Sequence, residues 1–185
     1  MSESHREWTS FRSAKGAAQR AADLIEVLLV PEPDPAAVAE VLRAHGELDP
    51  IELTGEDLGE LRAAAAELRA VFAARDVGEA AERLNALFAA HAGPPRLTSH
   101  GGAHDWHLHT DAHDDAPWGQ WLRTSSGLAL AVLLAERQAL PGGICAAPSC
   151  EKSFVDTGAG GPRRYCSTRC STRQRVAAHR AHRRE

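Results

Sequence analysis

The 185-residue sequence has few cysteines, few aromatic side chains and no long apolar run. Aromatic residues make up 5% of the chain, whereas alanine is abundant, and this composition favours helices over strands. The longest apolar run, residues 128–135, is too short to cross a bilayer, and residues 1–13 lack the apolar stretch of a secretory signal. We therefore expect a cytoplasmic protein without a membrane partner, whose thiols stay reduced.

Catalytic signatures are missing as well. The sequence contains no H-E-x-x-H, no G-x-S-x-G and no phosphate-binding glycine motif. Because these motifs are absent, the sequence offers no support for catalysis, and we expect that the protein is not an enzyme. Its length allows one domain with a proper core and a small appended module.

Charge is distributed unevenly along the chain. Residues 163–185 carry eight arginines, no lysine and one glutamate, a net charge of +7. The preceding residues carry 13 basic and 24 acidic side chains, a net charge of −11, so that the whole chain has −4. An acidic body with a basic tail suggests that the tail binds a polyanion, although it could instead pair with its own acidic body.

Hydrophobic periodicity predicts a helical domain over residues 14–140. Four amphipathic helices are expected before residue 93, and a longer apolar helix over residues 117–140. Asp34 followed by Pro35 indicates an N-cap and the first position of the second helix. Thr54, with acidic residues just after it, indicates the start of the third helix. The stripes of apolar residues on these helices would form the core of a bundle.

The pattern changes between residues 96 and 110, where two short extended segments flank a Gly-Gly turn. This arrangement predicts a small β-hairpin. Five histidines lie in and just after this segment: His100, His104, His107, His109 and His113.

Two of these histidines, His107 and His109, would project to the same side of a strand. They could bind a metal ion together with a nearby carboxylate, which would suit a metal sensor or a metal-dependent enzyme. The alternative is a polar hairpin whose histidines are exposed and whose Trp106 and Leu108 face the core.

All four cysteines lie near the C-terminal end, with the spacing C-x4-C-x15-C-x3-C. Two close pairs separated by a short loop can supply the four ligands of one structural zinc ion, and no open position would remain for catalysis. Two disulfides are the alternative, which a reducing compartment disfavours. The expected zinc ligands are Cys145, Cys150, Cys166 and Cys170.

A helix is expected to begin at the second cysteine pair, because residues four apart lie on one helix face. A turn at the first pair, a hairpin and this helix predict a treble-clef-like zinc module over residues 144–185. The helix would have one small, uncharged side that can dock on its own module and one arginine side. Arginine suits phosphate through its planar donor fork, so DNA is the expected partner. The candidate DNA-contacting residues are Arg163, Arg164, Arg169, Arg173, Arg175, Arg180, Arg183 and Arg184.

This module resembles the CGNR zinc finger. The resemblance rests on C-x4-C, then Phe154-x-Asp156, then Arg-Arg-Tyr before Cys166, and a fourth cysteine that opens a basic helix. The family is named for a Cys-Gly-Asn-Arg tetrapeptide, and residues 170–173 read Cys-Ser-Thr-Arg here. The body is similar to the ABATE domain that normally precedes this finger, through Ala-Ala-Asp-Leu-Ile-Glu-Val-Leu at residues 21–28. The resemblance implies a bacterial transcription regulator whose body senses a small-molecule effector.

Three functions remain open on the sequence alone. The first is a transcription regulator that binds DNA through a zinc-stabilised arginine helix. The second is a zinc-stabilised interaction module that binds protein or pairs two subunits as a homodimer. The third is a metal-dependent sensor or enzyme that uses His107 and His109.

Overall fold

The computed structural model describes residues 13–102, 105–158 and 163–183. This part of the chain contains six helices and two antiparallel hairpins, which confirms the mainly α prediction. The helices are α2 (Ala14–Leu28), α3 (Pro35–Ala44), α4 (Gly55–Phe72), α5 (Val77–His91), α6 (Trp118–Arg137) and α7 (Thr168–His182). The hairpins pair β1 (Arg96–Thr98) with β2 (His107–His109), and β3 (Gly142–Ile144) with β4 (Ser153–Val155).

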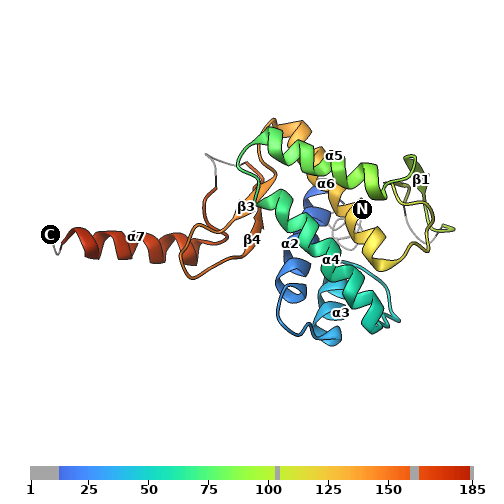
Figure 1. Cartoon of the computed structure of the whole chain (residues 1–185), viewed down its shortest axis with the longest axis horizontal. Helices are drawn as coiled ribbons and strands as arrows, with labels where there is room; N and C mark the ends of the chain where they lie inside the picture. Colours follow the sequence, from blue (N-terminus) through green and yellow to red (C-terminus); the bar gives the residue numbers. More distant parts are fainter. Residues whose placement is uncertain (1–12, 103–104, 159–162, 184–185) are drawn as a thin grey trace, which may run out of the picture.

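Helix α6 is the central element of the body, because it packs against α2, α4 and α5. The predicted apolar stripes meet there: Leu24, Leu61, Leu122 and Leu130 are fully buried in one core. Each such side chain stabilises the fold by about 1.5–3 kcal/mol. Figure 1 shows that the β1–β2 hairpin lies at one end of this body, whereas α7 projects away from the other end.

The helix starts follow the local chemistry that predicted them. The carboxylate of Asp34 accepts a hydrogen bond from the backbone N–H of Ala36 (3.0 Å), and Pro35 is the first helical residue. Thr54 and Asp57 form a reciprocal capping box at the start of α4, with 3.1 Å and 2.9 Å hydrogen bonds. Helix α6 is shorter than predicted and ends at Arg137, because Gln138 takes a left-handed conformation with φ of 50°.

Replacing the capping threonine tests this helix start. The variant Thr54→Ala is expected to lower the free energy of unfolding by about 1 kcal/mol at neutral pH. Hydrogen bonds from Thr54 lower the pKa of Asp57, so this stabilisation is complete above the unfolded pKa of about 3.9 and is lost as pH falls. Urea unfolding at pH 7 and pH 3 should show the difference between variant and wild type shrinking in acid. Thr157→Ala, at an exposed loop threonine, is the control and should have no effect at either pH. If Thr54→Ala and the wild type differed by the same free energy at pH 7 and pH 3, the link to the Asp57 carboxylate would be contradicted.

The β3–β4 hairpin joins the C-terminal module to the body. Val155 belongs to the body core, and β4 packs against α2. Lys152 pairs with Glu26 of α2 (3.0 Å), and the Arg137 guanidinium donates to the backbone carbonyl of Asp156. The hairpin lies between the body and α7 in Figure 1. The base of the C-terminal module is therefore fixed to the helical body.

None of the helices in the described part of the chain has the length and hydropathy needed to cross a lipid bilayer.

Candidate functional site

The four cysteines converge on one point, as the spacing predicted. Their sulfur atoms lie within 4.8 Å of one another. The Sγ of Cys166 is 3.7 Å from those of both Cys150 and Cys170. Four sulfurs at the usual Zn–S bond length form a tetrahedron with edges of about 3.8 Å. The cluster therefore fits one structural zinc ion with all four positions filled by thiolates.

The first cysteine pair is presented by a tight turn. The backbone N–H of Cys145 donates to the carbonyl of Lys152 (2.9 Å), and that of Cys150 donates to the carbonyl of Ala147 (2.9 Å). The second pair is tied to the first, since the N–H of Cys166 points to the sulfur of Cys145 at 3.4 Å. Such N–H donors stabilise thiolates.

The electrostatics of the site distinguish individual thiols. Burial raises the pKa of Cys145, but the backbone N–H groups of Cys166 and Ala147 outweigh it and bring the pKa to about 7. Burial dominates at Cys166 and raises the pKa of its thiol to about 12. Zinc therefore displaces protons when it binds to these cysteines.

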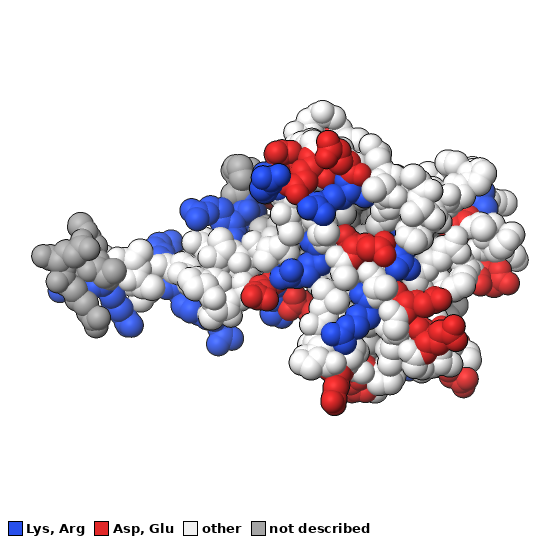
Figure 2. All heavy atoms as spheres, viewed as in Figure 1, with Lys and Arg blue, Asp and Glu red and all other residues white. Residues whose placement is uncertain are grey.

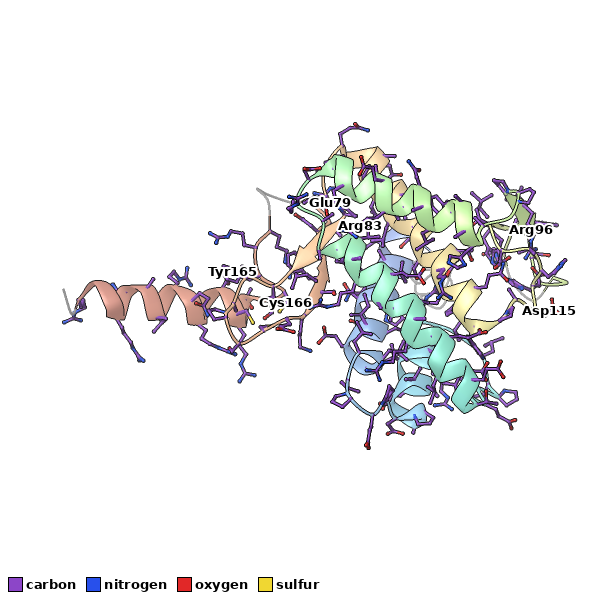
Figure 3. The ribbon with its side chains drawn as sticks, in the orientation of Figure 1. Glu79, Arg83, Arg96, Asp115, Tyr165 and Cys166 are labelled. Atoms are coloured by element: carbon purple, nitrogen blue, oxygen red, sulfur yellow. The ribbon has the colours of Figure 1, made fainter. Side chains whose placement is uncertain are left out.

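Helix α7 begins at this metal centre, but slightly later than predicted. The hydroxyl of Ser167 accepts a hydrogen bond from the N–H of Cys170 (3.3 Å), so Ser167 caps the helix and Thr168 is its first residue. Cys170 thus lies in the first turn, whereas Cys166 lies just before the helix. Figure 3 shows Tyr165 and Cys166 at the base of the projecting helix. Because this capped turn carries a ligand, zinc fixes the direction of α7.

Two of the candidate DNA-contacting arginines are engaged within the zinc module. Arg163 donates from Nε to the carbonyl of Tyr165 (3.0 Å) and from Nη2 to that of Cys166 (2.6 Å). Arg173 donates to the hydroxyl of Ser149, between the first two cysteines, at 3.1 Å. These two side chains brace the loops that hold zinc.

All the candidate arginines that the structure describes are exposed, including Arg163 and Arg173. Arg164, Arg169, Arg175, Arg180 and Arg183 lie on or beside α7 with their side chains in solvent, and Arg184 lies outside the described residues. The docked uncharged side that the sequence suggested is absent beyond the first turns of the described helix, because Ala177 and Ala178 are exposed too. Figure 2 shows basic side chains along the projecting part and both acidic and basic side chains over the body. Beyond its first turns, the described part of α7 is therefore a solvent-exposed, basic helix.

The structure brings His107 and His109 together with His100, their ring nitrogens lying within 4.8 Å of one another. The alternative of exposed histidines with a buried apolar side is wrong. Trp106 and Leu108 are 72% and 48% exposed, whereas the three rings are partly buried. Arg96 explains the reversal, because its ion pair with the buried Asp111 (2.6 Å) draws the polar side of the hairpin inward.

Comparison with protein-family models gives two matches. The CGNR zinc finger model matches residues 143–183, which include all four zinc ligands. The ABATE model, described as "putative stress-induced transcription regulator", matches residues 31–140. This match begins after α2, so residues 21–28 lie outside it. No curated protein matches the chain.

Proposed function

Because the chain belongs to the ABATE family of transcription regulators and ends in a CGNR zinc finger, we propose that it binds DNA through α7. The observation that supports this proposal is the exposed row of arginines on a helix whose base is fixed by zinc. Thr168–His182 contains no acidic residue, so nothing within the helix neutralises these charges.

The dimensions of α7 suit the major groove of DNA. Its 15 residues span about 22 Å at 1.5 Å per residue. The major groove is about 12 Å wide and admits one α-helix. The acidic body would be repelled by the phosphates, which leaves the projecting helix as the part that approaches DNA. Arg169, Arg180 and Arg183 are the side chains we assign to phosphate contact.

The helical body would act as the regulatory part. Its described residues line a cavity of about 670 Å³ beside α2, α6 and the β1–β2 hairpin, a volume typical of small-molecule sites. The proposal places the protein in the bacterial cytoplasm, where a ligand in this cavity would control DNA binding, and it includes no catalytic step.

The test is the salt dependence of DNA binding. With the wild type, log Kd for a random duplex should rise steeply with log salt concentration. The double variant Arg169→Ala, Arg180→Ala should bind roughly tenfold more weakly and reduce the slope by about 1.8, since each lost phosphate contact lowers it by about 0.9. Fluorescence anisotropy at four or more salt concentrations measures both quantities.

The matched control removes the same charge from the body. Arg43→Ala combined with Arg75→Ala replaces two solvent-exposed arginines that pair with Asp49 and Glu79. This control should keep the wild-type slope and affinity. An unchanged slope in the α7 variant, or an equal loss in the control, would contradict binding through α7.

One observation favours a second candidate function, in which the body, and not the zinc module that the sequence suggested, mediates protein interaction. Leu97, Trp106 and Leu108 form an exposed apolar surface on the β1–β2 hairpin, with Leu97 66% exposed. Such a surface could pair two subunits as a homodimer. That function predicts association that grows with protein concentration and survives high salt, which sedimentation distinguishes from salt-sensitive DNA binding.

A further inference from the structure

Three imidazole rings meet at the end of the body farthest from the zinc module. His107 and His109 lie on β2, opposite Thr98 and Arg96 of β1, and His100 follows β1 in a left-handed turn with φ of 50°. The Nε2 atoms of His100 and His107 are 3.1 Å apart. Nitrogen ligands of a tetrahedral zinc ion lie about 3.4 Å from one another. The spacing of these rings is therefore close to that of a metal site.

The orientation of His109 is fixed by a buried carboxylate. Its Nδ1 lies 2.8 Å from Oδ2 of Asp111, whose side chain is 2% exposed. Asp111 also pairs with Arg96 at 2.6 Å, and its carboxylate is placed to accept a hydrogen bond from Nδ1 of His109. The other ring nitrogen, Nε2, then carries the lone pair that a metal needs. A carboxylate behind a histidine is a usual arrangement at metal centres.

His107 and His100 also have an oxygen atom near their Nδ1, as His109 does. Nδ1 of His107 is 2.7 Å from the carbonyl oxygen of Asp105, and Nδ1 of His100 is 3.6 Å from Oδ2 of Asp114. Asp114 is itself held by Arg96 (2.6 Å) and by the hydroxyl of Thr98 (2.8 Å). When His107 donates from Nδ1 to the carbonyl oxygen of Asp105, its Nε2 presents a lone pair toward Nε2 of His100. A metal ion that binds both Nε2 atoms would take the place of the hydrogen bond between them.

The three rings also open onto the cavity of the body. His100, His107 and His109 line it together with Trp121 and the buried Arg20. A tetrahedral ion on three histidines keeps a fourth position, which water or a ligand in this cavity can fill. The cysteine centre has no such position. In Figure 3, Arg96 and Asp115 mark the histidine end of the molecule, opposite Tyr165 and Cys166.

We propose that His100, His107 and His109 bind a second divalent transition-metal ion, with an open position toward the cavity. Imidazole ligands suit zinc and the other late first-row ions. Asp111 is a positioning residue in this site, because it orients His109 without touching the ion. This inference does not require that α7 binds DNA, and the cysteine-bound zinc provides an internal reference of one ion per chain.

The experiment measures the metal content of the full-length protein after equilibration with zinc and removal of loose ions. The wild type should hold two zinc ions per chain, and His107→Ala and His109→Ala should each hold one. His113→Ala is the matched control, because His113 is an exposed histidine of the same segment outside the cluster. This control should keep two ions. One ion in the wild type, or two in both cluster variants, would overturn the proposal.

A titration with cobalt separates loss of the site from loss of the fold. Cobalt at the histidines should give a visible spectrum without the thiolate charge-transfer band that cobalt gives at the cysteines. Asp111→Asn should keep the ligands but weaken binding at the histidine site by roughly 10- to 100-fold. Unchanged affinity in this variant would overturn the positioning role of Asp111, and thiolate bands alone in the wild type would overturn the second site.

Discussion

Removal of zinc is expected to unfold α7 and the cysteine loops while the helical body stays folded. The apolar cluster around the metal is small: Cys145, Ala147 and Cys170 are its buried members, and it is separate from the body core. So little apolar surface cannot offset the entropy of ordering this module. Zinc contributes on the order of 10 kcal/mol to modules of this kind. Circular dichroism during chelation should show loss of a helix of 15 residues and no more.

Thiol alkylation provides the site-specific measurement for the same prediction. All four cysteines should resist iodoacetamide in the zinc-loaded protein and react after chelation, and added zinc should restore both protection and helicity. The β3–β4 hairpin should remain in place, because Val155 is buried in the body core. If the whole body lost its helical signal on chelation, the prediction that the body stays folded without zinc would be contradicted.

Local chemistry was enough to predict the helices and the metal ligands. Asp34 and Thr54 cap helices through hydrogen bonds to residues two and three positions ahead, which a sequence shows directly. The cysteine spacing also acts locally, since each pair chelates from one turn. In such places the interaction partners are neighbours in the chain, and the structure confirms the expectation.

Roles that depend on distant partners could not be read from the sequence. A helical projection groups Arg173 with the other arginines, yet its donor reaches Ser149, 24 residues earlier. Alternation along β2 places His107 and His109 on one face of the strand and Leu108 on the other. It does not show which face packs toward the body. The ion pair between Arg96 and Asp111, 15 residues apart, decides this. The sequence alone does not identify Arg96 and Asp111 as site residues, and their only signal is that they lie next to a histidine-rich segment.

Gly142→Ala is expected to cause the largest loss of stability at the contact between the two modules. A Cβ at this residue would overlap the carbonyl oxygen of Phe154 and lie 2.8 Å from two ring carbons of Phe72. Phe72 is 1% exposed at the end of α4, so its ring has no room to move away. Relief requires that β3 separate from β4 and from the body. We expect a loss of about 3 kcal/mol in the free energy of unfolding, measured from the midpoint of urea unfolding.

The adjacent glycine is the control for this substitution. The atoms nearest to a Cβ at Gly143 would be those of the Phe154 ring, at 3.1 Å or more, and a ring edge can shift by a few tenths of an ångström. Gly143→Ala should therefore cost less than about 1 kcal/mol. Both variants should keep their cysteines protected from alkylation, because zinc holds the cysteine loops independently of the body. Equal losses at the two glycines would contradict close packing at Gly142, and exposed thiols in Gly142→Ala would show that the metal centre depends on its attachment to the body.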